Sequence, residues 1–262
     1  MSDAAGNAVR EAARGDADAA FILHTYPYLE TSLILETFTR RHGRVSMIAK
    51  GARRPRSAMR GVLNGFQPLA LAWFGKSDLK TLKTAEHARI YPQLQGQALL
   101  SAFYLNELIL KLSHREDPHE GLFDAYDLAL QRLLQAHAAP EAERKNPTRT
   151  LGAILRLFEK QLLSELGYGL VLDHDAAGAP VDPRARYIFI VERGAVLAGS
   201  REASAHAAVE LRGKTLLDMA GDDYTDAVTA QQSKQLMRYV INHHLNGVDL
   251  NTRQLIRELQ QT

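Results

Sequence analysis

The order of apolar and polar positions divides the chain into two parts with different periods. From residue 21 onward, short segments alternate between apolar and polar residues, and turn-forming pairs such as His42-Gly43 and Asn64-Gly65 separate them. This pattern predicts five β-strands, at residues 21–25, 32–39, 45–49, 66–74 and 79–91. Five strands within about 70 residues are typical of a small closed barrel.

After residue 92 the apolar residues recur at helical spacing, which predicts α-helices at residues 97–113 and 121–137. A third helix is predicted to begin with Asn146 as its N-cap and Pro147 in its first turn, and to end with Gly167 as its C-cap. We expect an irregular, glycine-rich excursion at residues 168–202, with one hairpin formed by residues 187–191 and 196–197. Helices are expected again at residues 203–211, 214–220 and 229–246, and from about Thr252.

These patterns predict three parts: a mobile leader at residues 1–20, a barrel domain at residues 21–93 and a helical domain at residues 94–262. The leader is rich in alanine, contains four acidic residues and lacks an apolar core, so it is not expected to be a signal peptide. No apolar run approaches the roughly 20 residues that cross a bilayer, and we expect a cytoplasmic protein. The absence of cysteine excludes disulfides, thiolate metal sites and a cysteine nucleophile.

Charge is distributed unevenly between these parts. The net charge is +2, but residues 21–93 contain 12 Lys and Arg against 4 Asp and Glu, whereas residues 94–262 contain 18 against 22. Residues 37–77 include nine basic residues and no acidic one. Such a run is ordinarily a solvated surface, but the lack of acidic residues favours a surface for a polyanion.

A positively charged five-stranded barrel suggests an OB-fold, whose sheet face and loops hold single nucleic-acid strands. The predicted fold class is therefore α+β, with an N-terminal five-stranded OB-fold β-barrel followed by a mainly α-helical C-terminal domain. Trp73 and Phe74 must face opposite sides of their strand, so one of them is a candidate for stacking on bases, although core packing explains such aromatic residues more often.

Other chemistry finds little support in the sequence. His243 and His244 point about 100° apart on a helix, so they do not form the i, i+4 pair of a zinc helix. Neither a phosphate-binding glycine loop nor a nucleophile elbow is present, and the carboxylates form no motif of a metal-dependent nuclease. We therefore predict a protein without enzymatic activity, metal or cofactor.

Several phrases of the sequence, taken in order, resemble the bacterial RecO family of recombination mediators over nearly the whole chain after the leader. They are ETSLIL at residues 30–35, GRVSMIAKGARR at 43–54, FQPL at 66–69, LKTLKTAE at 79–86, YLNEL at 104–108, RLFE at 156–159, LSELGYG at 163–169 and LNTRQL at 250–255. Each phrase alone is a weak signal, and their order and spacing together are specific.

The resemblance implies a non-enzymatic DNA-repair protein that binds single- and double-stranded DNA and anneals complementary strands. It also implies help in loading RecA onto DNA coated by single-stranded-DNA-binding protein, with RecR as a partner, in the nucleoid. Lys50, Arg53, Arg54 and Arg56 match the basic loop of the family. The residues that we expect to bind DNA are Arg40, Arg41, Arg44, Lys50, Arg53, Arg54, Arg56, Arg60, Lys80 and Lys83.

In the helical domain, Arg156 matches a basic position where such proteins bind the acidic, apolar C-terminal tail of the single-stranded-DNA-binding protein. Leu108, Leu112 and Phe158 are the expected walls of that site. Many relatives carry a four-cysteine zinc motif after the phrase at residues 163–169, but this chain has no cysteine there, so zinc is not carried over. We expect the 187–197 hairpin to brace this region instead.

Two alternatives stay open. A charged OB barrel would serve equally well in an RNA-binding module of translation or ribosome assembly. A metal-dependent nuclease without a recognisable motif is the other alternative.

Overall fold

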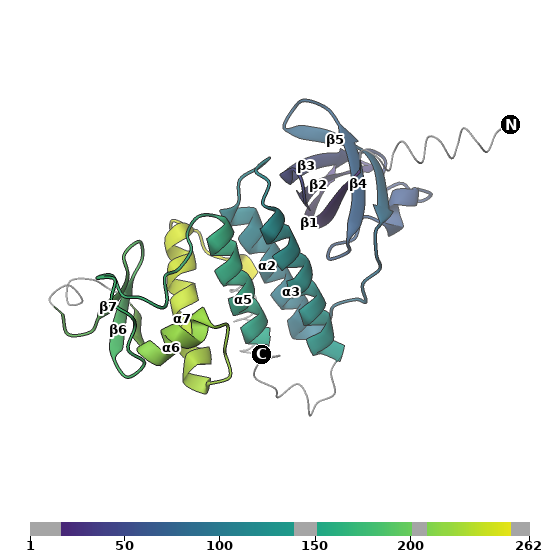
Figure 1. Ribbon diagram of the computed structural model, residues 1–262. Coiled ribbons are helices and arrows are strands. Elements are labelled where there is room, and N and C mark those ends of the chain that lie inside the picture. The colour runs from purple at the N-terminus through teal and green to yellow at the C-terminus, as the bar shows by residue number, and fades with distance from the viewer. Residues whose placement is uncertain (1–16, 139–150, 201–208, 253–262) are drawn as a thin grey trace. The chain divides into compact units, whose positions relative to one another are not determined.

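The computed structural model describes residues 17–138, 151–200 and 209–252 (Figure 1). Five strands close into a barrel, in the order β1-β2-β3-β5-β4. Their bounds are β1 Asp18–Tyr28, β2 Ser32–Thr39, β3 Gly43–Ala49, β4 Leu69–Phe74 and β5 Leu79–His87, with a short 3-10 helix, η1, at Ala58–Gly61. Strand β5 pairs with β3 in parallel and with β4 antiparallel, and β4 pairs with β1. This arrangement confirms the predicted OB-fold.

Side chains that alternate along the strands fill the barrel interior. They include Ala20, Ile22, Leu35, Val45, Met47, Leu69, Leu71 and Leu82. A five-stranded barrel is narrow enough for such residues to pack across it, which leaves a solid core instead of a channel. Because β1 starts at Asp18, the barrel includes three residues that we expected in the leader.

The outer face of β1 and β2 also carries aromatic residues, which pack on a helix that follows the barrel. The helices α2, Gly96–Leu112, and α3, Glu120–Ala138, follow the barrel. Phe21 and Phe38 of the barrel lie with their ring centroids 5.3 and 5.6 Å from that of Phe123 on α3. The barrel and Asn106–Leu130 thus form one compact unit.

A close backbone contact fixes the start of β3 against the loop between α2 and α3. Gly43 has a left-handed φ of 65°, and a Cβ built on it would lie 2.0 Å from the carbonyl oxygen of Asp117. Only glycine fits there, because any side chain would clash with backbone as well as strain φ.

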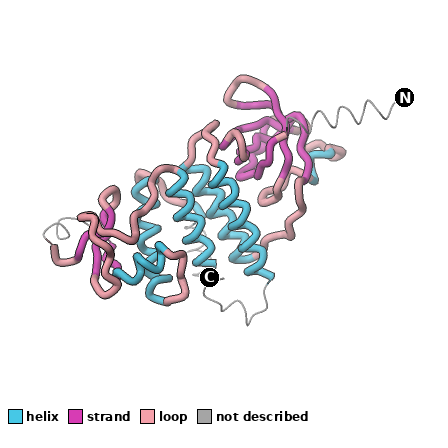
Figure 2. The backbone as a smooth tube through the Cα atoms, in the orientation of Figure 1, coloured by secondary structure: helices cyan, strands magenta, loops and turns pink. Residues whose placement is uncertain are grey.

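The second compact unit contains Leu94–Leu105 and the chain from Gln131. Its further elements are α5 Leu151–Glu165, β6 Arg186–Ile190, β7 Gly194–Leu197, β8 Val209–Arg212, α6 Gly213–Ala220 and α7 Ala227–His244 (Figure 2). Helix α7 contacts both α5 and α6. No helix within the described ranges is both long and apolar enough to cross a membrane.

The end of α5 confirms the predicted C-cap. Gly167 has a φ of 83°, and the amide of Tyr168 donates to the carbonyl of Leu163 at 2.7 Å, as in a Schellman turn. Asn146 and Pro147, the predicted start of this helix, lie outside the described residues.

The predicted hairpin is present as β6 and β7, but the helix predicted at residues 203–211 is wrong at its end. Residues 209–212 form β8, in which Val209 pairs with Phe189 and Leu211 with Tyr187 of β6. The open edge of β6 supplies hydrogen-bond partners that override the helical preference of the local sequence. The earlier residues of that prediction, 203–208, lie outside the described ranges.

Candidate nucleic-acid interface

The hairpin of β2 and β3 separates the basic residues into two groups. Arg40, Arg41 and Arg44 lie at its turn, where Thr39 pairs with Gly43. Lys50 and the residues after it follow the opposite end, where Leu33 pairs with Ala49. Six residue steps of β3 lie between, a distance of about 20 Å. The ten predicted DNA-binding residues therefore do not form a single patch.

Arg40 and Arg41, at the turn, are neutralised by carboxylates. Nε of Arg40 lies 3.1 Å from Oε2 of Glu120, and its Nη1 and Nη2 atoms donate to Asp124. The hydrogen bonds that Arg40 donates to Asp124 raise the pKa of Arg40 above its ordinary value. Nε of Arg41 lies 3.2 Å from Oδ1 of the buried Asp18. In this structure, both arginines therefore form ion pairs within the first compact unit.

Arg44 serves the end of helix α2. Its Nη1 donates to the carbonyl oxygens of Leu110 and Ser113, at 2.6 and 2.7 Å, and its Nη2 lies 3.6 Å from Glu36. A guanidinium at this place satisfies carbonyls that have no partner within the helix. Burial lowers the pKa of Arg44, and Glu36 opposes that effect.

Of the two lysines of β5, one forms an ion pair and the other does not. Lys80 pairs with Glu116, with Nζ 2.5 Å from Oε1. Lys83 is exposed and lies three residues further along β5. Since β5 runs parallel to β3, with Thr81 opposite Ile48, Lys83 lies toward the end of the barrel where β3 leads into Lys50.

We call residues 50–60 the basic loop. Its charged residues are all exposed: Lys50, Arg53, Arg54, Arg56 and Arg60. Within the part of the chain that the structure describes, neither these side chains nor that of Lys83 form an ion pair or a hydrogen bond. Apart from the exposed Lys76, which precedes β5 at the opposite end, the unneutralised positive charge of the barrel is therefore concentrated at this end.

Backbone hydrogen bonds fix the basic loop to the barrel. The amide of Arg53 donates to the carbonyl of Thr31 at 2.8 Å, which ties the loop to the turn between β1 and β2. That turn is one of the loops with which OB-folds hold single strands. Ala52, between the exposed cations, is buried and anchors the loop in the core. The charged side chains are thus presented from a fixed backbone.

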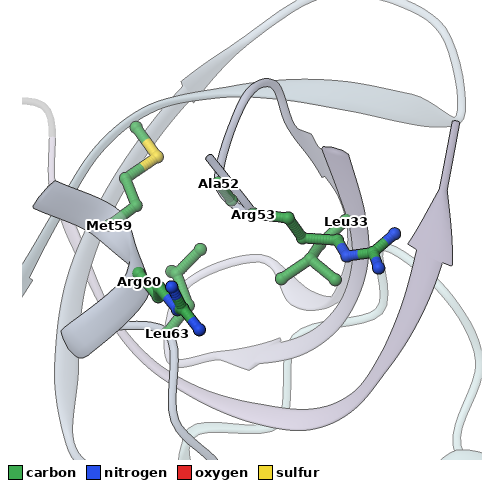
Figure 3. Close-up of a pocket in the computed structure, with 6 residues that line it drawn as sticks. All are labelled: Leu33, Ala52, Arg53, Met59, Arg60 and Leu63. Atoms are coloured by element: carbon green, nitrogen blue, oxygen red, sulfur yellow. The ribbon is translucent and has the colours of Figure 1, made fainter. Parts of the chain in front are cut away.

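A pocket of about 230 Å³ opens beside the basic loop (Figure 3). Leu33, Ala52, Met59 and Leu63 give it apolar walls, and Arg53 and Arg60 complete the lining. Sequence reasoning missed this pocket. The only signal was the apolar pairs, Ala58-Met59 and Val62-Leu63, within a charged segment.

Trp73 and Phe74, neighbours on β4, face opposite sides of the strand, as the alternation of side chains requires. Trp73 is partly buried, packs against the barrel core and lies with its ring centroid 5.1 Å from that of His42. Phe74 is 58% exposed. Of the two, Phe74 is the one available to a base.

The predicted tail-binding residues are divided between the two compact units: Leu108 and Leu112 belong to the unit of the barrel, and Arg156 and Phe158 to the other unit. Arg156 is buried and donates to the fully buried Glu159, which also accepts a hydrogen bond from the Tyr104 hydroxyl at 2.7 Å. Burial opposes the charge of Arg156, but Glu159 and Tyr104 outweigh it, so its pKa is raised. Leu108 and Phe158 are buried and Leu112 partly buried. The tail site stays a prediction, and contact with Arg156 requires some opening of the surrounding structure.

Where relatives were expected to carry zinc, a carboxylate organises the backbone. Oδ1 of Asp175 accepts from the amides of Ala177 and Ala179, each at 2.9 Å, and the amide of Ala176 donates to Ala195 of β7 at 2.7 Å. Among the described residues there is no cluster of three or more His, Asp or Glu side chains that could hold a metal ion. The described residues of this region therefore do not fit a zinc site.

Comparison with known proteins accounts for almost the whole chain. Residues 17–91 match the family model "Recombination protein O N terminal", and residues 93–254 match "Recombination protein O C terminal". The chain belongs to the RecO family. It is 49% identical over 249 residues to the DNA repair protein RecO of Thiobacillus denitrificans, covering 95% of this chain and 94% of that protein.

Other members of the RecO family are similarly close. The DNA repair protein RecO of Nitrosospira multiformis is 48% identical over 95% of this chain and 97% of its own length. That of Aromatoleum aromaticum is 48% identical over 95% and 98%. The basic loop and its pocket lie within the residues that match the N-terminal family model.

Proposed function

We propose that this protein acts in DNA repair and recombination by binding single-stranded DNA along the basic loop, without catalysing a reaction. The observation that carries this proposal is the group of six exposed cations without partners, five of them in the basic loop, at one end of an OB barrel. Guanidinium groups pair with phosphate oxygens and release condensed counterions, and this binding requires no particular base.

Annealing would follow from the same charges. Two DNA strands repel each other through their phosphates, and bound cations screen that repulsion. Since the barrel holds the backbone, most base edges stay free to pair. From the resemblance to the RecO family we also propose binding to double-stranded DNA, RecA loading on DNA coated by single-stranded-DNA-binding protein, and partnership with RecR in the cytoplasmic nucleoid.

Binding of a labelled single strand, measured between 50 and 200 mM salt, tests the proposal. If six phosphates are contacted, a slope of about −0.7 per phosphate predicts a roughly 300-fold loss of affinity over this range. With Arg53, Arg54 and Arg56 all changed to alanine, the loss should fall to about 20-fold, because three contacts remain. Affinity at 50 mM salt should also be weaker than that of the wild type.

A charge-matched control is available in the other compact unit. Arg184, Lys234 and Arg238 are exposed, and their replacement by alanine removes the same net charge. This control should keep the wild-type slope. Equal slopes in all three proteins would exclude the basic loop as the DNA site. An RNA strand of the same sequence that competes better than DNA would instead favour the RNA-binding alternative.

A further inference from the structure

The pocket beside the basic loop combines an apolar interior with a cationic rim. Figure 3 shows Arg53 beside Leu33 and Arg60 beside Leu63, with Ala52 next to Arg53 and Met59 on η1. Both arginines are exposed and lack partners in the described parts of the chain. A ligand for this site must therefore have an apolar portion attached to negative charge.

The size of the pocket limits that apolar portion. Its volume of about 230 Å³ is below the roughly 300–1,000 Å³ of sites for drug-sized ligands, so it suits one ring system. Apart from the two arginines, no lining side chain donates or accepts a strong hydrogen bond. Such walls cannot distinguish one base from another. The sulfur of Met59 and the planes of the guanidinium groups make favourable contacts with aromatic rings.

We propose that this pocket receives one nucleobase of a bound DNA strand, of any sequence, while Arg53 and Arg60 hold the phosphates on either side of it. The inference rests on the proposed function and adds a subsite to it. A strand held in this way is fixed in position along the barrel, which phosphate contacts alone do not achieve, and its other bases remain free to pair.

Charge favours a nucleic-acid strand over the end of a peptide chain. A peptide with an apolar last residue brings only one terminal carboxylate. Arg53 and Arg60 alone would pair with it and leave the other cations unused. The basic loop presents five cations within 11 residues, and Lys83 adds another at the same end. A DNA strand carries one phosphate per nucleotide, so it can use all of them.

Filling the pocket tests the inference. Met59→Trp places an indole into it from η1, and Ala58→Trp adds the same indole at an exposed neighbouring position outside it. Each protein is titrated with a normal single strand and with a strand of equal length made of abasic residues, which keeps the phosphates. The wild type should bind the normal strand about 5- to 150-fold more tightly, the range for one stacked base. This ratio should fall several-fold in Met59→Trp, where only bases stacked elsewhere still contribute, and persist in Ala58→Trp.

A measurement on the unchanged protein covers the case in which Met59→Trp does not fold. A strand containing 2-aminopurine is mixed with the wild type, and quenching of its fluorescence by acrylamide is recorded. A base held in the pocket should be protected, so part of the fluorescence should resist quenching. Quenching that is unaffected by the protein would overturn the inference.

The remaining outcomes separate the two proposals. Failure to bind either strand would overturn the proposed function itself. Equal affinity for normal and abasic strands, or an unchanged ratio in folded Met59→Trp, would overturn only the pocket. A peptide with a C-terminal phenylalanine that displaces DNA from the wild type and binds poorly to Met59→Trp would assign the pocket to a protein tail instead.

Discussion

Arg156 and Glu159 share a buried site on α5, and neither charge is stable there without the other. We predict that Arg156→Ala lowers the free energy of unfolding by about 3–5 kcal/mol, because it leaves a buried carboxylate uncompensated. The double variant Arg156→Met with Glu159→Gln should recover most of that loss, since no charge remains and Tyr104 can still donate. Urea denaturation measures both. A single variant as stable as the wild type would contradict the prediction.

This pair also affects how a tail-binding assay is interpreted. Loss of peptide binding in Arg156→Ala alone would not separate a lost contact from a loosened helix. Loss that persists in the stable double variant would support a direct contact with the tail.

At the residue scale, the sequence identified the basic positions but not their partners. Arg40 pairs with Glu120 and Asp124, which lie 80 and 84 residues further along the chain. Nothing local in a run without acids reveals that pairing. The exposed basic loop was predictable because glycine and proline mark it as a turn, whereas the pocket depends on Leu33, which comes from another strand.

Helix α7 ends in His244, a histidine whose pKa is lowered by its surroundings. The ring of His244 stacks on Tyr168 at 4.0 Å between centroids, next to His243, which lies 3.5 Å from Glu192. Burial, with a smaller effect from His243, lowers the pKa of His244, and Glu192 opposes this. In the unfolded chain the pKa of a histidine is about 6.5. As the pH falls below this value, the unfolded chain therefore takes up a proton on His244 more readily than the native state does.

Stability should accordingly decrease as the pH falls below about 6.5, by more in the wild type than in His244→Phe, which keeps a ring for Tyr168 but cannot titrate. Urea midpoints at pH 5, 6, 7 and 8 measure the difference. His114→Gln, at an exposed position with no ion pair or ring contact among the described residues, provides the control and should follow the wild type. Parallel curves for wild type and His244→Phe would show that the stacked ring does not contribute.

Elements with a strong local period could be predicted from the sequence, and elements that depend on a distant edge could not. The strands of the barrel and the helices α2, α3 and α7 have a clear apolar face or a clear cap, such as Asp226 of α7, which accepts from the amide of Thr229. Strand β8 lacks such a signal, because its conformation depends on the backbone of β6. The bulge in β1, between Ile22 and His24, was likewise invisible in the sequence.

At the scale of the molecule, we expect the barrel to unfold together with residues 106–130, the parts of α2 and α3 that belong to the same compact unit. We predict that Phe123→Ala on α3 destabilises the barrel by about 3–5 kcal/mol, since Phe21 and Phe38 lose their cover. Trp73, the single tryptophan, lies in β4 and reports barrel unfolding by its fluorescence. Leu128→Ala, at an exposed position on the same helix, should leave the transition unchanged. A Trp73 transition unaffected by Phe123→Ala would mean that the barrel is stable alone.

The apolar outer face of the barrel also matters while the chain is being made. The cover for Phe21 and Phe38 includes Tyr126, which is added about 33 residues after Gln93, or roughly 2–7 s later at 5–20 residues per second. During that interval a nascent barrel presents aromatic side chains to solvent. A chaperone that binds the growing chain should therefore engage it before α3 emerges and leave once the helix has docked.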